Sequence, residues 1–153
     1  MTPVTALKLA MTNAMLSEHD VWRLGALLTK KAPLSSGTNQ MANDPKQVHA
    51  SHVYGLGTHA EEMALRGATP EKTSGANIYV ARATRGGNIG MARPCSRCMS
   101  AIIAAGIKKV FYTASPNSYG VLKVNSLETL DPRGERIVQF SESDISDFLS
   151  IIR

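Results

Sequence analysis

The sequence contains only two cysteines among its 153 residues, and it has no run of about 18 apolar residues. Two cysteines are too few for the disulfide framework on which many small secreted domains depend. The first nine residues also lack the charged segment and the long apolar segment of a secretory signal. We therefore expect neither a membrane span nor secretion, and a cytoplasmic location would keep both thiols reduced.

Aromatic residues and charge clusters are scarce as well. Aromatic side chains make up 5% of the sequence, and no block of five or more like charges occurs. Few aromatics weigh against a broad surface that stacks on the bases of single strands. The formal net charge is +5. A positive charge favours an anionic partner, either a nucleotide phosphate or a nucleic-acid backbone, although a generic solvated surface would give the same value.

The hydrophobic pattern alternates between helix-like and strand-like periods along residues 1–153, a length typical of a single domain. Such alternation predicts an α/β protein in which helices cover a sheet. Residues 41–57 form the one long irregular stretch, and loops of that length are often functional. We expect helices at 4–17, 58–67, 94–105 and 142–153, strands at 21–28, 34–40, 77–84 and 108–113, and weaker strands at 121–124 and 136–140.

The residues with the most distinctive chemistry lie in two short segments, each at the expected start of a helix. Cys95 and Cys98 stand three apart directly behind Pro94, and His59 lies upstream, two residues before Glu61. One imidazole and two thiolates are three protein ligands for zinc. Three protein ligands leave a fourth position for water, which is the arrangement of a catalytic zinc site rather than a structural one.

The placement of these residues suits metal chemistry. Two cysteines three apart in the first turn of a helix project to one face, where the helix dipole favours thiolates. His59 begins a different helix, so a zinc ion would link the two helices and stabilise the fold. Zinc-bound water is acidic enough to supply hydroxide near neutral pH, and Glu61 would carry protons between this nucleophile and the substrate.

Each residue also has a simpler interpretation. Thr58 and Glu61 have the spacing of a helix capping box, and Cys95 with Cys98 alone could be a redox pair. The conjunction of the cysteine pair with its preceding proline and a separate His-x-Glu favours catalytic zinc. Glu62 should point elsewhere on the helix, and we expect it to be structural or exposed to solvent.

Taken together, the segments resemble those of the cytidine and deoxycytidylate deaminase superfamily. The resemblance implies a three-layer α-β-α sandwich around a central mixed five-stranded sheet, and it also implies a homo-oligomer. The matching residues are Gly37-Thr38-Asn39, His59-Ala60-Glu61, Pro94-Cys95-Ser96-Arg97-Cys98, Ala101-Ile102-Ile103 and Gly106-Ile107-Lys108.

The same resemblance implies roles for single residues. One zinc ion per chain would be held by His59, Cys95 and Cys98, with Glu61 as the proton shuttle. Asn39 matches the position that contacts the sugar in these enzymes, and the backbone of Ala60 is expected to line the base pocket.

The substrate is less sharply defined. Histidine as the first ligand is typical of the deoxycytidylate and nucleic-acid deaminases, and residues 59–65 also resemble tRNA adenosine deaminases. Residues 103–108 are closer to the deoxycytidylate type. The leading hypothesis is therefore zinc-dependent hydrolytic deamination of a cytosine nucleotide or nucleoside. The alternatives are a deaminase of cytosine or adenine within single-stranded DNA or RNA, and a non-catalytic zinc-stapled binding module.

Further residues bear on these alternatives. Arg93 and Arg97 are candidate substrate contacts; with Arg82 and Arg85 they cluster around the cysteine helix, where they could bind a phosphate. His49 and His52 could join a second metal, or one of them could close the zinc site as a fourth ligand.

Overall fold

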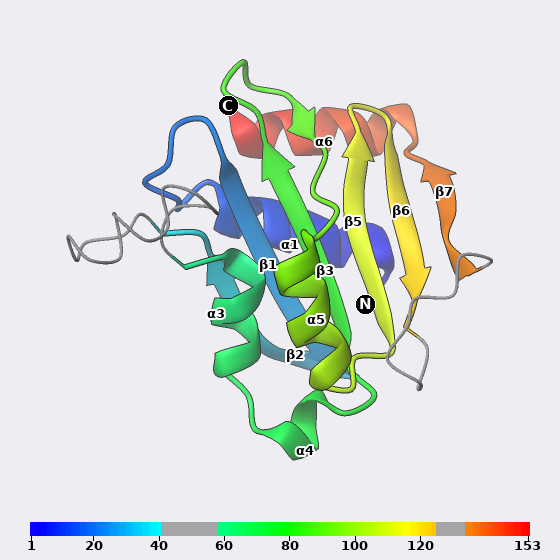
Figure 1. Ribbon diagram of the computed structural model, residues 1–153. Helices are drawn as coiled ribbons and strands as arrows, with labels where there is room; N and C mark the ends of the chain where they lie inside the picture. The colour runs from blue at the N-terminus through cyan, green and yellow to red at the C-terminus, as the bar shows by residue number, and fades with distance from the viewer. Residues whose placement is uncertain (41–57, 125–133) are drawn as a thin grey trace.

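The computed structural model describes residues 1–40, 58–124 and 134–153 (Figure 1). Its helices are α1 (Pro3–Ala14), α3 (Ala60–Arg66), α4 (Pro70–Thr73), α5 (Ser96–Ala104) and α6 (Glu142–Ile152). Its strands are β1 (Arg23–Lys30), β2 (Ala32–Thr38), β3 (Asn77–Ala83), β4 (Ile89–Gly90), β5 (Lys109–Ser115), β6 (Ser118–Lys123) and β7 (Arg136–Gln139).

All the strands belong to one mixed sheet. Its order is β2-β1-β3-β5-β6-β7, with β4 paired to β3 beside this path. Among the strands that the structure describes, only β3 and β5 run parallel, and the other pairings are antiparallel. The mixed sheet is confirmed, but the expected count of five strands is wrong, because the described residues form seven. The strand β4 was not predicted, because its two residues are too few to give a clear period-2 signal, whereas β7, with four residues, corresponds to the weaker strand expected at 136–140.

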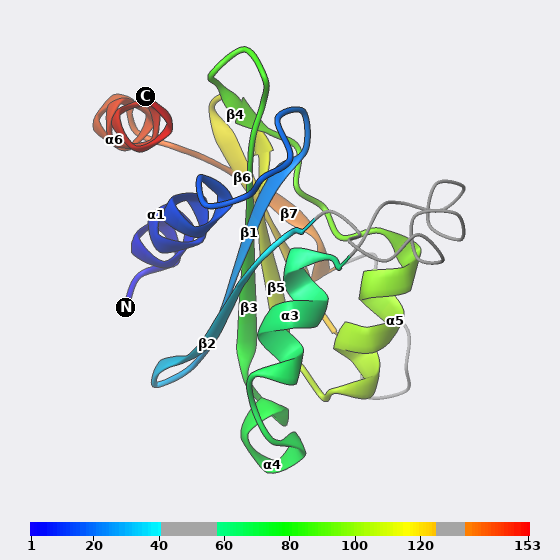
Figure 2. The ribbon, with the colours of Figure 1, turned by 90° about the vertical axis from the view of Figure 1, so that its left-hand side faces the viewer.

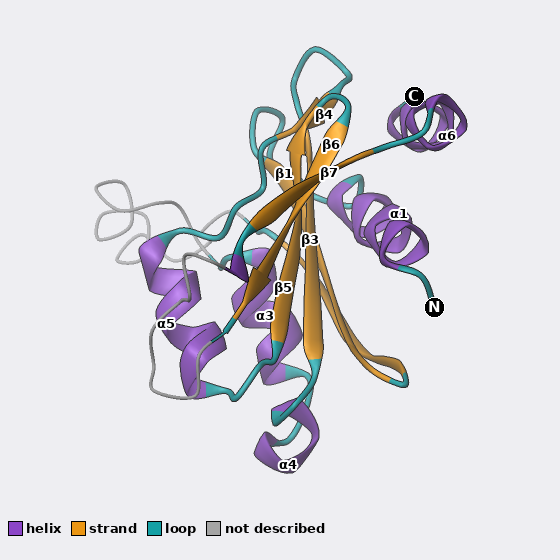
Figure 3. Ribbon diagram, turned by 90° about the vertical axis from the view of Figure 1, so that its right-hand side faces the viewer, coloured by secondary structure: helices purple, strands orange, loops and turns teal. Residues whose placement is uncertain are grey.

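Helices cover both faces of the sheet, which confirms the three-layer arrangement. Figures 2 and 3 show α1 and α6 on one side and α3 and α5 on the other. The strand β3 explains why both faces need cover: Tyr79 and Ala81 point into the core beneath α1 and α6, whereas Ile78 and Val80 point into the core on the α5 side. A strand that is apolar on both faces must be buried on both.

The ends of the elements follow local chemistry. Lys31 has a φ of 70° and turns the chain between β1 and β2. The helix α6 begins where the Ser141 hydroxyl accepts the Asp144 N–H at 3.1 Å, as its sequence predicts. Gly106, with a φ of 77°, follows the end of α5. The start of α5 differs from the expectation: Cys95 is the N-cap, so Pro94 precedes the helix instead of opening it.

Among the helices that the structure describes, none combines the length and the apolar character needed to cross a lipid bilayer.

The close contact between α1 and the sheet depends on Gly25 in β1. A Cβ atom at this position would lie 2.0 Å from the carbonyl oxygen of Ala10 and 2.3 Å from the backbone nitrogen of Ala14. Both obstacles are helix backbone, which cannot rotate away as a side chain can. The small residues Ala6, Ala10 and Ala14 on the buried side of α1 are fully buried, so the helix lies directly on the sheet.

We expect Gly25→Ala to destabilise the protein by about 3 kcal/mol or more, because overpacking of a filled core costs about 1–3 kcal/mol and here backbone would have to move. Thermal unfolding followed by circular dichroism would measure the loss. Gly86→Ala is the matched control, since a Cβ at Gly86 would meet only the Thr84 hydroxyl at 3.9 Å. Equal melting temperatures for the two variants would contradict this account of α1 packing.

Candidate metal centre

Two helix N-termini bring the candidate metal ligands together on one face of the sheet. His59 is the N-cap of α3, and Cys95 is the N-cap of α5. Cys98 lies in the first turn of α5 and is fully buried. Figure 2 shows α3 and α5 side by side over this face. Residues 36 and 39 positions apart in sequence therefore meet at the beginnings of two neighbouring helices.

The ligand atoms have the spacing that zinc requires. Nδ1 of His59 lies 3.1 Å from Sγ of Cys98 and 3.7 Å from Sγ of Cys95. All three ligand atoms lie within 4.8 Å of one another. Zinc bonds of about 2.3 Å to sulfur and 2.0–2.1 Å to nitrogen place tetrahedral ligand atoms roughly 3.5–3.8 Å apart. The three residues thus fit one zinc ion with little movement.

The protonation of the ligands is set mainly by burial. Burial lowers the pKa of His59, which favours the neutral imidazole that binds metal. Burial also raises the pKa of the Cys98 thiol, and the nearby Glu61 and Cys95 add to this effect. Burial thus opposes the thiolate that the start of α5 is expected to favour at Cys98. Its deprotonation must come with the binding of a cation.

Glu61 is a buried carboxyl group beside the candidate ligands. Its side chain is 4% exposed, and its Oε1 has no hydrogen-bond partner among the described residues. Burial raises the pKa of this carboxyl group, since the charged form is poorly solvated there. An unpartnered buried oxygen is costly in a native structure, and a catalytic role or a bound ion is among the explanations for it.

A small cavity of about 200 Å³ opens beside the ligands. At its rim the guanidinium of Arg82 lies 3.8 Å from the centroid of the Trp22 ring, a cation–π contact. Sequence reasoning missed Trp22, although it is the only tryptophan in the chain. The cavity is lined by Trp22, Leu24, His59, Glu61, Arg82, Met91, Ala92, Arg93 and Cys95.

The expected substrate contacts lie in different surroundings. Arg93 lines the cavity. Arg97 does not belong to the cavity lining, and its Nη2 forms an ion pair with Oε1 of Glu62 at 2.9 Å. The amide of Asn39 is held by backbone: its oxygen accepts the Leu24 N–H at 2.9 Å, and its nitrogen donates to the Trp22 carbonyl.

Ala60 is fully buried at the first position of α3 and is likewise outside the cavity lining. Its carbonyl oxygen would lie 2.2 Å from a Cβ at Gly37, so a glycine in β2 allows α3 to approach the sheet. His49 and His52 lie outside the described residues.

Glu62, the neighbour of Glu61, has the structural role expected for it. Its Oε1 accepts the backbone N–H of His59 at 3.3 Å, which caps α3. The cap of α3 is therefore made by Glu62, and not by the pair of Thr58 and Glu61 that the spacing suggests. Because Glu62 also binds Arg97 on α5, it connects the two helices that carry the ligands.

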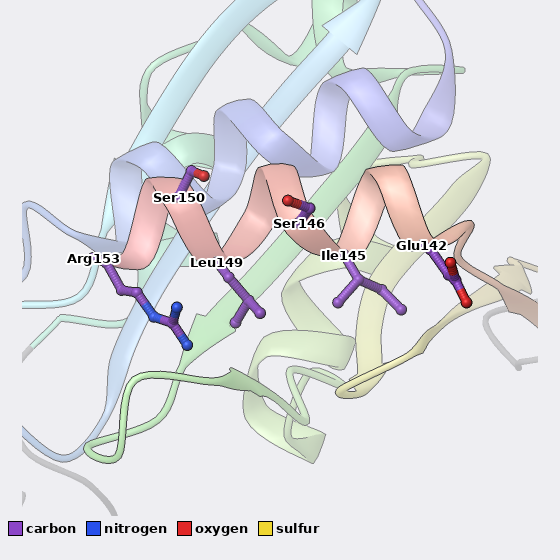
Figure 4. Close-up of a pocket in the computed structure, with 6 residues that line it drawn as sticks. All are labelled: Glu142, Ile145, Ser146, Leu149, Ser150 and Arg153. Carbon is purple, nitrogen blue, oxygen red and sulfur yellow. The ribbon is translucent and has the colours of Figure 1, made fainter.

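A larger hollow of about 480 Å³ lies along α6, on the opposite face of the sheet from the ligands (Figures 2 and 4). It contains no cysteine or histidine, and we assign it no chemistry. Its lining consists of Glu142, Ile145, Ser146, Leu149, Ser150 and Arg153.

The fold and the ligand cluster together define a zinc-binding deaminase. Residues 3–114 match the family described as the cytidine and deoxycytidylate deaminase zinc-binding region. The chain belongs to this family, and the cluster of His59, Cys95 and Cys98 supports a single zinc ion. No curated protein sequence matches the chain.

Solved structures share the fold at low sequence identity. The dCMP deaminase of the cyanophage S-TIM5 in apo form is 23% identical, with a TM-score of 0.53; the match covers 72% of this chain and 80% of that one. The same cyanophage enzyme in complex with dCMP and dUMP is 22% identical, with a TM-score of 0.52, and covers 73% and 82%. RibD from Acinetobacter baumannii is 21% identical, with a TM-score of 0.48, and covers 73% of this chain but 28% of RibD.

Removal of the metal should destabilise the protein, because bound zinc links α3 to α5. A chelator is expected to lower the melting temperature of the wild type by about 10 °C or more, the equivalent of a few kcal/mol of lost metal binding. Cys98→Ala should melt low from the start and respond little to the chelator. Metal content by mass spectrometry and melting by calorimetry would be measured together. A wild type that loses its zinc without any change in melting would refute the link between the helices.

Proposed function

We propose that this protein hydrolyses the exocyclic amine of cytosine in a free nucleotide or nucleoside, giving the uracil product and ammonia. The observation that carries the proposal is Glu61: its buried Oε1 has no hydrogen-bond partner among the residues that the structure describes, and it lines a cavity together with two candidate metal ligands. General acid–base catalysis requires such a group within reach of the reacting atoms, with a pKa raised towards the working pH.

The overall reaction defines what Glu61 must do. Hydrolysis replaces the C4–N bond of cytosine with a C4–O bond, and the two protons of water end on N3 of the ring and on the departing ammonia. Bound zinc, held by His59, Cys95 and Cys98, would lower the pKa of water so that hydroxide is available near neutral pH. Glu61 would take one proton from water and pass it to N3, and would then take the second proton from the oxygen now bonded to C4 and deliver it to the amine that leaves as ammonia.

Several features support a small cytosine substrate. The cavity is small, at about 200 Å³, and two arginines, Arg82 and Arg93, are among the residues that line it. Apolar side chains of Leu24 and Met91 supply surface against which a flat base can lie. The cyanophage relative solved with dCMP and dUMP makes a pyrimidine nucleotide the first substrate to test.

The second candidate is a deaminase that acts on an unpaired base within DNA or RNA. The observation in its favour is Trp22, which is 50% exposed at the cavity rim, on a chain with a net charge of +5. An extruded base can stack on such a ring while its backbone meets positive charge. This candidate needs a binding track longer than one nucleotide and a strong dependence on salt.

Glu61→Gln should keep the zinc and the fold but lose at least about 10²–10⁴-fold in kcat, since proton transfer typically contributes that much. Deamination would be followed by mass spectrometry, with zinc content and melting temperature measured on the same preparations. Glu71→Gln, which removes an exposed carboxylate in α4, is the matched control and should leave kcat unchanged. Wild-type turnover by Glu61→Gln would remove the residue from the mechanism.

The substrate class is tested by a panel of cytidine, deoxycytidine, CMP, dCMP, adenosine and short oligonucleotides that contain C or A. We expect turnover of cytosine monomers and none of adenosine. Turnover of oligonucleotides alone, suppressed steeply by salt, would select the second candidate. Absence of turnover across the panel by a zinc-loaded protein would favour a non-catalytic binding module.

A further inference from the structure

Three polar side chains from separate parts of the sequence meet in a series of hydrogen bonds, and one of them, Arg93, lines the cavity. Tyr112 lies in β5, Glu135 directly precedes β7, and Arg93 precedes α5. The Tyr112 hydroxyl donates to Oε1 of Glu135 at 2.6 Å, and Nε of Arg93 donates to the same oxygen at 3.2 Å. Neither Tyr112 nor Glu135 belongs to the cavity lining, whereas Arg93 does.

Tyr112, at one end of this series of hydrogen bonds, is held in place by the apolar core. Tyr112 is 2% exposed and belongs to the apolar cluster on the α5 side of the sheet. Its ring crosses β6 at Gly120, where a Cβ atom would lie 2.1 Å from Cζ of the ring. Burial and the contact with Glu135 raise the pKa of Tyr112 to about 12, so the hydroxyl keeps its proton and acts as the donor. The hydrogen bond from Tyr112 in turn lowers the pKa of Glu135, which favours the carboxylate.

Arg93, at the other end, lines the cavity and has hydrogen-bond donors that Glu135 does not engage. Among the described residues, hydrogen bonds engage only Nε of Arg93 and leave the terminal nitrogens available. A free arginine side chain loses much rotamer entropy when it is immobilised on a ligand. A guanidinium that is already held at Nε loses less, so it binds more tightly for the same contacts.

The charges at the cavity indicate what Arg93 binds. Arg82 and Arg93 both line it, beside the ligand residues His59 and Cys95. Arg82 lies over the Trp22 ring, and the described residues give it no ion pair with a carboxylate. Two guanidinium groups, of which Arg93 is paired at Nε with Glu135, suit a terminal phosphate, which carries about −1.5 to −2 charges at pH 7, better than an internucleotide diester with a single charge. Guanidinium also matches the geometry of phosphate oxygens with two parallel N–H donors.

We propose that Tyr112 and Glu135 are positioning residues that hold the Arg93 guanidinium at the cavity, where it binds the terminal phosphate of a nucleoside monophosphate. This inference rests on the proposed function and narrows its substrate from nucleosides and nucleotides to monophosphates. Neither positioning residue touches the substrate; each acts through Arg93.

Binding of the reaction product tests this without turnover. The chain has a single tryptophan, Trp22, at the cavity, so its fluorescence should report bound ligand. Tyr112→Phe and Glu135→Gln should each weaken dUMP binding about 3–10-fold and leave deoxyuridine binding unchanged. Arg93→Ala should weaken dUMP by at least 10-fold, and adding Tyr112→Phe to it should cost nothing more, because coupled residues are not additive.

Tyr119→Phe is the matched control for the lost hydroxyl. Tyr119 lies in the neighbouring strand β6 but in the core on the other face of the sheet, where it packs against Phe140. The Tyr119→Phe variant should bind dUMP and deoxyuridine as the wild type does. Zinc content and melting temperature would be measured for every variant. Equal weakening of dUMP and deoxyuridine would show that Tyr112 and Glu135 serve only packing, and unchanged dUMP binding in both variants would also overturn the inference.

The wild type separates this inference from the proposed function. If it deaminates deoxycytidine as efficiently as dCMP, the proposed function stands and the phosphate role of Arg93 fails. If an oligonucleotide with internal deoxyuridine binds as tightly as dUMP, the terminal phosphate is not what Arg93 recognises. If no cytosine monomer is turned over but dUMP binding shows the expected losses, the proposed reaction fails while the phosphate site stands.

Discussion

The structure depends on the meeting of two helix N-termini over one face of a mixed sheet. His59 and Cys95 are each the N-cap of a helix, so the direction of α3 and α5 fixes where their side chains go. Small residues allow the approach: Gly37 in β2 leaves room for the backbone of α3 at Ala60. Glu62 then joins the cap of α3 to Arg97 on α5. The cluster of candidate ligands thus results from backbone packing. It is supported by the Glu62 carboxylate, which caps α3 and pairs with Arg97 on α5.

The two faces of the sheet have separate tasks. The face beneath α1 and α6 is a packed apolar core, with stacked Tyr79 and Phe111 whose ring centroids lie 4.5 Å apart. The other face carries a second apolar core, and it is there that the buried polar groups of the cavity gather. The layer on one side holds the strands in place, while on the second side Oε1 of Glu61 is buried without a hydrogen-bond partner in the described part of the chain. Functional groups that cost stability are commonly supported by packing elsewhere.

Local sequence signals predicted the parts of the molecule that depend on near neighbours. The cysteine spacing, the His-x-Glu pattern and the main strands could be predicted because each signal lies within one short segment of the sequence. Contacts between distant segments could not: nothing in the pattern connects Trp22 to Arg82, or Tyr112 to Glu135. Asn39 is a further example: its amide is held by the backbone of Trp22 and Leu24, which the pattern does not show, while the sugar contact suggested by the family resemblance stays a prediction. The short strand β4 was not predicted either, because two residues show no periodicity.

The parallel pairing between β3 and β5 has a consequence for the order of folding. The hairpins β1–β2 and β5–β6 each join strands that are adjacent in sequence and can form from local contacts. Bringing β5 beside β3 requires the long crossover through β4 and α5, and non-local contacts of this kind form slowly. His59 lies in the connection before β3, and both cysteines lie in the crossover after it. We therefore expect the three ligands to come together once β5 has paired with β3, so that metal binding depends on this non-local pairing.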